Sequence, residues 1–245
     1  MHSVGVDVGG SGCRIAVIDL HTGRIEGEIV RLPHDEHASA ASVLTGLGDA
    51  LMRMPDLPVG LGFPGLVLGT EVQSAPNLHA TWPGLDLASA LARPTLVLLN
   101  DADAAAVAEA RLGASKGCSG TVLMVTVGTG LGSGIHRDGS LVPGFELGLL
   151  PHPTRGGRLE DHASGRARNR EGLDLAAWAD RFNEALAVME SEVNPDLIVI
   201  GGGITEHWTR FEAGLNASAP IRKATFGAHA GLVGAALMAE EDLNA

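Results

Sequence analysis

Two stretches of the chain share a pattern, an apolar, β-branched run that breaks into a glycine turn. The first, residues 4–14, has the sequence VGVDVGGSGCR, and the second, residues 121–134, has the sequence TVLMVTVGTGLGSG. Such runs predict buried strands. Glycines let the backbone adopt positive φ and approach a ligand closely, and successive backbone N–H groups in a turn can bind phosphate oxygens. The pattern therefore predicts two phosphate-binding turns, although a glycine turn alone is often only a hairpin.

The second half of the chain repeats the order of features found in the first half. Val8 aligns with Val127, and each glycine turn is followed by a short apolar strand. A hairpin signal containing Asp and Gly comes next in both halves, at residues 19–23 and 136–139. We therefore expect two related halves, each of which presents one phosphate-binding turn.

The remaining hydrophobic patterns predict strands that alternate with helices. Strands are expected at residues 3–7, 13–19, 24–32, 58–65, 93–99, 121–127 and 197–200. Helices are expected at residues 38–54, 86–91, 102–113, 159–170, 173–193, 204–215 and 228–243, and a polar loop at residues 71–82. This alternation indicates an α/β fold with mixed sheets. We expect an N-terminal lobe of residues 1–108 and a C-terminal lobe of residues 109–245, with the closing helix packed back on the first lobe.

Composition restricts the possible partners. The chain has 245 residues and a formal net charge of −12, which argues against general binding of nucleic acid or of an anionic membrane. Its two cysteines, Cys13 and Cys118, lie far apart and have no zinc-binding spacing. No apolar run has the roughly 18–20 residues of a membrane span, and the first strand leaves no room for a signal peptide. We therefore expect a cytoplasmic protein.

Five motifs follow one another in a characteristic order. They are DVGGSGCR at residues 7–14, LND at 99–101, VGTGLG at 127–132, ELG at 146–148 and GGG at 201–203. This order resembles that of the ROK-family sugar kinases, and within that family it is most similar to the polyphosphate glucokinases. The similarity continues through residues 62–65, 100–104, 163–168, 195–203 and 230–236, so that it covers nearly the whole chain.

The resemblance implies a fold and an activity. The implied fold is the actin-like ATPase fold, which is ribonuclease H-like, with two lobes and a central cleft. The implied reaction transfers a phosphoryl group from polyphosphate, ATP or both to the 6-hydroxyl of glucose or a related hexose, with Mg²⁺ as cofactor. A homodimer is also implied. The alternatives are a kinase of the same fold that acts on mannose or an amino sugar, and a catalytically silent sugar- or nucleotide-binding protein.

Asp101 is the candidate general base. Phosphoryl transfer to a sugar needs a carboxylate within hydrogen-bond reach of the attacking hydroxyl, and the resemblance assigns this task to Asp101. The pair Asn100-Asp101 before an alanine-rich run is also what an ordinary helix N-cap looks like. Both interpretations remain open on the residues alone, and the other motifs favour catalysis. Asp103 is expected to be structural.

Four polar residues match positions that bind sugar hydroxyls in the family. Amides and carboxylates suit this task because a hydroxyl both donates and accepts hydrogen bonds. The residues are Asn77, Asn100, Glu146 and Glu160. The alternative is that all four are ordinary solvated polar residues of loops.

The resemblance also assigns residues to phosphate, nucleotide and metal. The phosphate- or nucleotide-binding candidates are Asp7, Gly9, Gly10, Ser11, Gly12, Arg14, Thr126, Gly128, Thr129, Gly130, Gly132, Gly201, Gly202 and Gly203. A carboxylate beside a phosphate turn would repel the donor unless it held Mg²⁺ or one of its waters, which predicts that role for Asp7. The alternative for Asp7 is a turn-capping residue. Arg14 stands where these relatives usually have Lys.

The chain departs from the family at one sugar-binding position. The Glu-x-Gly-His motif is here Glu146-Leu147-Gly148-Leu149, so the usual histidine is absent. His152 could replace it only after a rearrangement of the loop, which we do not expect. The cysteine-rich zinc motif of many ROK proteins is also absent, as it is in polyphosphate-using members. We expect a weakened contact with one sugar hydroxyl.

A cluster of arginines stands out in an acidic chain. It comprises Arg155, Arg158, Arg166, Arg168 and Arg170, in a chain with only 17 Lys and Arg residues. A local positive strip of this kind can attract a long polyanion. The alternative is a solvated helix face whose arginines pair with Glu160, Asp161 and Glu171.

Overall fold

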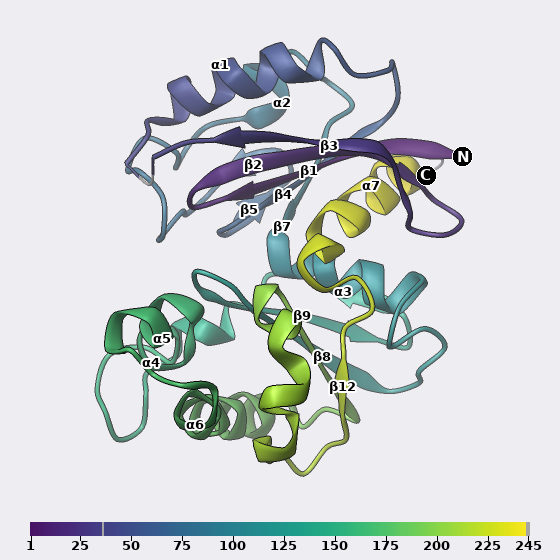
Figure 1. Cartoon of the computed structure of the whole chain (residues 1–245). Coiled ribbons are helices and arrows are strands. Elements are labelled where there is room, and N and C mark those ends of the chain that lie inside the picture. Colours follow the sequence, from purple (N-terminus) through teal and green to yellow (C-terminus); the bar gives the residue numbers. More distant parts are fainter. Residues whose placement is uncertain (36, 244–245) are drawn as a thin grey trace. The chain divides into compact units, whose positions relative to one another are not determined.

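The computed structural model of the chain describes residues 1–35 and 37–243 (Figure 1). Two compact units are present, one of Met1–Ala108 with Gly231–Ala245 and the other of Glu109–Ala230. Each unit is built on one five-stranded sheet with helices packed against it. Within the described part of the chain, no helix is long and apolar enough to cross a membrane.

The sheet of the first unit has the strand order β3-β2-β1-β4-β7. Its strands are β1 (His2–Gly9), β2 (Gly12–Asp19), β3 (Ile25–Pro33), β4 (Val59–Phe63) and β7 (Val97–Asn100). The first three form an antiparallel meander, whereas β4 and β7 run parallel to β1. The predicted strands are therefore present, although β7 is shorter than expected.

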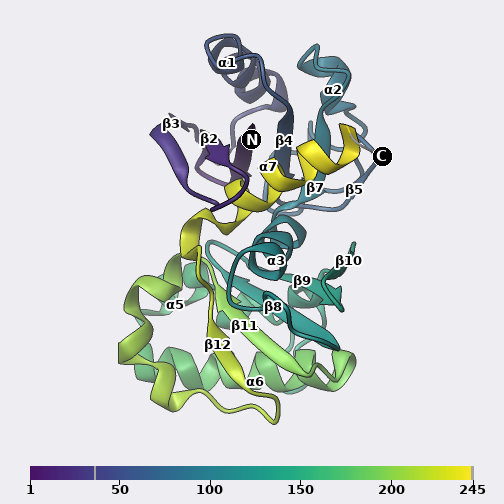
Figure 2. The ribbon, with the colours of Figure 1, turned by 90° about the vertical axis from the view of Figure 1, so that its right-hand side faces the viewer.

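The helices of the first unit lie on both faces of this sheet. Helices α1 (Ala40–Leu51) and α2 (Leu87–Ala90) lie on one face, and α7 (Ala230–Leu243) lies on the other (Figures 1 and 2). Each of the first two begins where the sequence supplies an N-cap. The Ser39 hydroxyl accepts a hydrogen bond from the amide of Ser42, and the Asp86 carboxylate accepts one from the amide of Ser89.

Residues 71–82 differ from the expected polar loop. They contain β6 (Glu71–Val72), which pairs with β5 (Val67–Leu68) in a small hairpin. The Trp82 side chain is fully buried and packs against Phe63, with 5.1 Å between the ring centroids. The local sequence is polar, but this one aromatic side chain anchors the segment to the core.

Helix α7 packs against its neighbours backbone to backbone. A Cβ atom on Gly60 of β4 would lie 1.8 Å from the carbonyl oxygen of Ala235. A Cβ atom on Gly234 would lie 1.7 Å from the carbonyl oxygen of Ala104 in α3 (Asp101–Arg111). Both distances are far below van der Waals contact, so glycine is required at each point of approach.

The sheet of the second unit has the strand order β10-β9-β8-β11-β12. Its strands are β8 (Thr121–Val127), β9 (Leu131–Arg137), β10 (Ser140–Val142), β11 (Leu197–Gly201) and β12 (Ile221–Lys223). Again the first three are antiparallel, and β11 and β12 continue the sheet in parallel. The two sheets therefore have the same strand order and directions, which confirms the predicted internal repeat.

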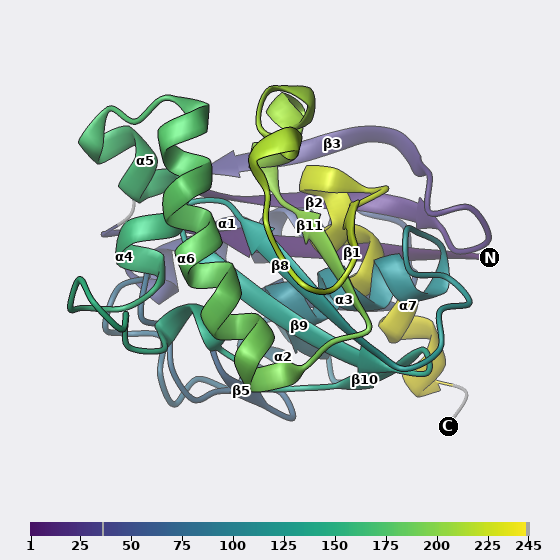
Figure 3. The ribbon, with the colours of Figure 1, turned by 90° about the horizontal axis from the view of Figure 1, so that it is seen from below.

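Three helices follow β10 in the second unit. They are α4 (Glu160–Ala163), α5 (Gly165–Glu171) and α6 (Leu175–Val193) (Figure 3). The buried face of α6, with Trp178 and Phe182, belongs to the same apolar cluster as Leu123 of β8. The single helix predicted at residues 159–170 is divided, because Ser164 has extended backbone and caps α5.

The helix predicted at residues 204–215 is two short 3₁₀ segments instead. They are η2 (Gly203–Arg210), which is kinked at His207, and η3 (Glu212–Gly214). The Thr205 hydroxyl donates a hydrogen bond to the carbonyl of Gly202 at 2.8 Å. Such a local side-chain bond competes with regular helical pairing, which accounts for the difference.

A buried carboxylate joins the end of α3 to a distant segment of the second unit. The Glu109 side chain is fully buried and accepts hydrogen bonds from the amides of Ala114, Thr225 and Phe226 at 2.7–3.0 Å. Three backbone donors compensate the cost of burying this group.

A pair of glycine substitutions tests the packing of α7. We expect Gly60→Ala to destabilise the protein by at least ~1–3 kcal/mol, because the new methyl group overlaps Ala235. Gly48→Ala in α1 meets no atom within 4 Å and is expected to stabilise the helix by ~0.5–1 kcal/mol. Thermal unfolding followed by circular dichroism measures both. Equal Tm values for the two variants would contradict the packing described here.

Candidate functional site

The carboxyl ends of three neighbouring parallel strands meet at one edge of the first sheet. Asp7 of β1 pairs in register with Gly62 of β4, which in turn pairs with Leu99 of β7. Ligands of open α/β sheets usually bind beyond this edge. Asp7 and the start of α3, which carries Asp101, are therefore placed where the fold class binds ligands.

Asn100 caps helix α3. Its Oδ1 accepts hydrogen bonds from the amides of Ala102 and Asp103 at 2.8 and 3.1 Å, and its Nδ2 donates to the carbonyl of Gly65 at 3.1 Å. The capping role that we had considered for the Asn-Asp pair is thus filled by Asn100. Asp101 follows as the first residue of the helix, where the helix dipole favours a carboxylate. A further contact of Asn100 with sugar stays a prediction.

Asp7 forms an ion pair with Arg14 on the neighbouring strand. The two residues face each other across β1 and β2, and Nε of Arg14 donates to Oδ2 of Asp7 at 3.0 Å. Asp7 is 8% exposed. A Cβ atom on Gly231 of α7 would lie 3.3 Å from Oδ1 of Asp7 and 3.7 Å from the carbonyl oxygen of Asp101. Both predicted acidic residues therefore border the same point of α7.

The Cys13 thiol, next to the first glycine turn, is not reactive near pH 7. Cys13 is buried on β2, and burial, reinforced by the charge of Asp7, raises its pKa to about 12. It is therefore neutral near pH 7 and does not act as a nucleophile there.

The first glycine turn lies beside one of the predicted sugar-binding residues. Gly9 pairs with Gly12 to close the turn between β1 and β2. A Cβ atom on Gly10 would lie 4.0 Å from the carbonyl oxygen of Asn77. The backbone of Asn77 therefore comes close to the turn, and its side chain is half-buried.

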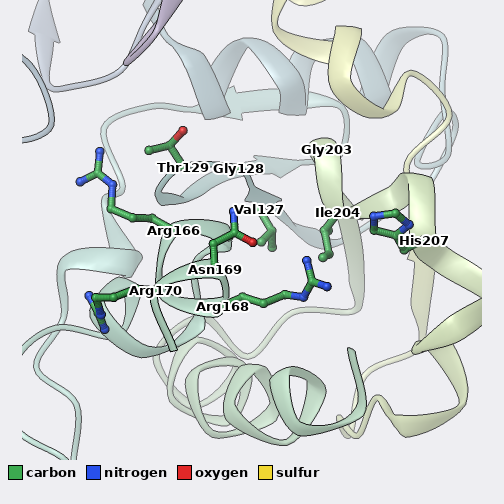
Figure 4. Close-up of a pocket in the computed structure, with 11 residues that line it drawn as sticks. Val127, Gly128, Thr129, Arg166, Arg168, Asn169, Arg170, Gly203, Ile204 and His207 are labelled. Carbon is green, nitrogen blue, oxygen red and sulfur yellow. The ribbon is translucent and has the colours of Figure 1, made fainter. Parts of the chain in front are cut away.

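The second glycine turn opens into a pocket of about 650 Å³ (Figure 4). Segments from three parts of the second unit form it. The lining residues are Val127, Gly128, Thr129, Gly165, Arg166, Arg168, Asn169, Arg170, Gly203, Ile204 and His207. The predicted phosphate turn, the arginine-rich helix α5 and the third glycine turn are thus brought together.

Close backbone contacts hold the three segments of the pocket in place. The amide of Gly165 donates to the carbonyl of Gly128 at 2.9 Å, and a Cβ atom on Gly165 would lie 2.5 Å from that oxygen. Gly202 has φ of 80°, and a Cβ atom there would lie 2.5 Å from the carbonyl oxygen of Val127. The second glycine turn is therefore fixed from both sides.

The pocket lining is cationic, and the described residues that form it include no carboxylate. Arg168 extends toward Ile204 and His207, whereas Arg166 and Arg170 extend to the opposite side (Figure 4). Nε of Arg168 is buried and has no hydrogen-bond partner among residues 1–35 and 37–243. A buried, unpaired guanidinium nitrogen in a cavity is suited to an anionic ligand.

The five arginines of the predicted strip do not form one surface. Arg166, Arg168 and Arg170 line the pocket, whereas Arg155 pairs with Glu184 through two hydrogen bonds of 2.7 and 2.6 Å. Arg158 lies 3.7 Å from Glu160. The strip therefore divides into a pocket part and a part that fixes the preceding loop.

The segment that carries Glu146 is fixed beside β9. The Ser133 hydroxyl accepts a hydrogen bond from the amide of Leu147 and donates one to the carbonyl of Phe145, both at 2.8 Å. A Cβ atom on Gly148 would lie 1.9 Å from the carbonyl oxygen of Leu131, so the glycine of the Glu-x-Gly motif is required. Leu149 follows and is half-buried.

Glu160 begins helix α4 and is 8% exposed. His152, on the intervening loop, has its Nε2 3.2 Å from Oε2 of Glu184 of α6. Glu146, Glu160 and the pocket belong to the second unit, and Asp7, Asn77, Asn100 and Asp101 to the first.

Sequence reasoning missed several pocket residues. Asn169, Ile204 and His207 line the cavity but belong to no motif that we had linked to a ligand. Gly165 lies in the segment 163–168 that resembles the family, and this was the available signal for its close approach to Gly128.

A model of the ROK family matches residues 3–153 of the chain. The chain belongs to the ROK family. It is 32% identical to a polyphosphate glucokinase of Mycobacterium tuberculosis over 98% of this chain and 92% of that protein. This membership confirms the resemblance drawn from the five motifs.

Solved structures agree with this assignment. The inorganic polyphosphate/ATP-glucomannokinase from Arthrobacter sp. strain KM superposes with a TM-score of 0.88 at 35% identity, covering 99% of this chain and 98% of that chain. A ROK glucokinase from Streptomyces griseus, solved with glucose and AMPPNP, superposes with a TM-score of 0.79 at 25% identity. The match covers 98% of this chain and 100% of that chain. The predicted actin-like ATPase fold is confirmed by these likenesses.

Proposed function

We propose that this protein is a sugar kinase that transfers a phosphoryl group from polyphosphate or ATP to the 6-hydroxyl of glucose or a related hexose. The observation that carries the proposal is the pocket at the second glycine turn, lined by three arginines and a histidine. Likeness over nearly the full chain to a polyphosphate glucokinase and to a polyphosphate/ATP-glucomannokinase supports the reaction class.

Asp101 acts as the general base in this proposal. It stands at the first position of α3, while Asn100 supplies the helix cap. Its carboxylate accepts the proton of the sugar hydroxyl as that oxygen attacks the terminal phosphorus of the donor. The bond from the phosphorus to the bridging oxygen then breaks, and the shortened donor leaves.

Asp7 and Arg14 are proposed to act on the donor phosphates and on Mg²⁺. Mg²⁺ keeps several waters and is usually bound by one or two carboxylates together with substrate phosphates. No group of three or more His, Cys, Asp or Glu forms a metal site in the described part of the chain. The chemistry of the Asp7 carboxylate fits this mode, and a bound Mg²⁺ would neutralise phosphate charge. Arg14 would hold Asp7 in orientation.

The charge of the pocket favours polyphosphate as the donor. Beyond the reacting phosphates, ATP presents a neutral adenosine, whereas polyphosphate presents further anionic groups. Arg168 and His207 lie together on one side of the pocket, and no carboxylate lines it. Gly203 and Ile204 leave room there for adenosine as well. Polyphosphate is therefore the donor that the lining suits better, with ATP as the second.

Asn77, Asn100, Glu146 and Glu160 are proposed to bind the sugar. Leu149 offers no hydrogen bond where the family has histidine, so one hydroxyl is bound less well. Mannose is a second candidate acceptor, because the Arthrobacter protein is named a glucomannokinase. A lobe boundary between residues 108 and 109 and a cytoplasmic location are proposed from the sequence pattern and composition, and a homodimer is proposed from the family resemblance.

Substitution of the base tests the reaction. Asp101→Asn preserves shape, and we expect kcat to fall by at least ~10²-fold with little change in KM for sugar. Asp103→Asn, in the same helical turn, serves as the control with near-normal kcat. Steady-state assays with polyphosphate and ATP against glucose, mannose and glucosamine give both values. Turnover of no hexose by the parent protein would favour the silent binding protein instead.

Neutralisation of Arg168 tests the donor. We expect Arg168→Gln to raise KM for long polyphosphate about tenfold or more, because a charge-assisted hydrogen bond is lost. KM for ATP should change much less, and the difference should shrink as salt screens the charge over ~8–10 Å. Arg137→Gln, an exposed arginine outside the pocket, is the matched control. Equal effects on both donors would contradict the assignment.

Restoring the family histidine tests the sugar site. An unsatisfied buried hydroxyl costs ~1–3 kcal/mol, so Leu149→His should raise kcat/KM for glucose about tenfold or more, mainly through KM. The same assays with mannose and glucosamine identify the hydroxyl concerned. A micromolar KM for glucose in the parent protein, with no gain in the variant, would show that another group fills this position.

A further inference from the structure

The two proposed sugar carboxylates of the second unit are joined by a narrow loop. Between Glu146 and Glu160, the amide of Leu159 donates to the carbonyl of Leu150 at 2.9 Å, and the amide of His152 donates to the carbonyl of Gly157 at 2.8 Å. Pro151 and Arg158 also form an antiparallel bridge. The path of this loop, residues 151–158, therefore sets where α4 and Glu160 begin.

The imidazole of His152 is the centre of the loop. Its side chain is 1% exposed, and its Nδ1 lies 3.4 and 3.3 Å from the amide nitrogens of Thr154 and Arg155, both of which donate to it. A ring nitrogen that accepts hydrogen bonds carries no proton. His152 is therefore in the neutral form, with its proton on Nε2.

Charged groups surround His152 on each side. Nε2 lies 3.2 Å from Oε2 of Glu184 on α6, and Glu184 is held in turn by Arg155 of the loop. Arg181 on the same helix also acts on Glu184 electrostatically. From α4, the ring of His162 lies 4.9 Å away, and its Nε2 contacts the carbonyl of Gly156 at 2.9 Å.

We infer that His152 is a positioning residue for the sugar site: its neutral imidazole fixes the loop between Glu146 and Glu160, and protonation of Nδ1 releases it. The inference rests on the proposed function for its effect on catalysis. A protonated Nδ1 donates instead of accepting, so the amides of Thr154 and Arg155 lose their shared partner. Nothing in the proposed transfer step requires His152, so the effect falls on sugar binding.

The direction of the pH dependence follows from the surroundings of the ring. Burial, followed by the charge of His162, lowers the pKa of His152 below its ordinary value of 6.5, although Glu184 opposes the shift. Above 6.5 the imidazole is neutral in both folded and unfolded chains, and the loop is fully stable. Stability is lost as the pH falls below 6.5 toward the lowered pKa. The sugar site should therefore weaken on the acid side.

The test compares two substitutions at this position. In His152→Asn, Oδ1 stands where Nδ1 was, accepts the same two amides and does not titrate. His152→Leu removes the acceptor at every pH. We expect KM for glucose in the parent protein to rise about fivefold or more between pH 7.5 and 5.5, because the loop loses its two hydrogen bonds to Nδ1. It should stay flat in the Asn variant and be high throughout in the Leu variant, with KM for the donor unchanged.

Two controls separate this effect from general acid destabilisation. His21→Asn, on an exposed turn of the first unit, should keep the acid rise. His136, another buried imidazole with a lowered pKa, is retained in all variants, so its contribution is common to them. An acid rise that persists in His152→Asn, or that appears equally in KM for the donor, would overturn the inference.

Hydrogen exchange gives a readout that does not depend on activity. After correction for intrinsic exchange rates, amides of residues 151–158 should lose protection at pH 5.5 in the parent protein and keep it in His152→Asn. Unchanged protection in the parent protein at pH 5.5 would overturn the inference even if the protein is an active kinase. Loss of protection in a protein that turns over no hexose would uphold the role of His152 in the loop while the proposed function fails.

Discussion

The first unit depends on the close approach of α7 to the backbone of its neighbours. Gly5 and Gly60 of the sheet and Gly234 of the helix each leave so little room that a Cβ atom would lie within 2.1 Å of a carbonyl oxygen. Interiors are packed densely, so a helix at this distance has little freedom to shift. The same helix places Gly231 beside both Asp7 and Asp101. The glycines that allow α7 to pack closely therefore also set how α7 lies beside Asp7 and Asp101.

The sequence predicted most of the fold because its strands carry strong local signals. Both glycine turns and the paired strands around them depend on neighbouring residues. Other missed features depend on residues far away in the chain. The edge strand β12 is three residues long and pairs with β11, and the Glu109 carboxylate binds amides more than a hundred residues later. Periodicity contains no information on such contacts.

The motifs of the candidate site were predictable from the sequence. Which of their residues lie together in the structure was not. The resemblance supplied Asp101 and the phosphate turns as predictions. The separation of Arg168 from Arg155 could not be foreseen, because Gly165 fixes α5 against the phosphate turn and Glu184 draws Arg155 away from it. The chain has a net charge of −12, but this pocket is lined by three arginines and a histidine. An overall charge therefore says little about a local binding preference.

The repeated sheet has a consequence for the chemistry that each copy can carry. The alignment of Val8 with Val127 places Asp7 opposite Thr126 and Arg14 opposite Ser133. One copy thus carries an ion pair, and the other carries two neutral hydroxyl residues, of which Ser133 serves the neighbouring segment. Divergence at these two positions gives matching places of the two sheets unlike charge, so that a duplicated architecture carries two chemically different turns.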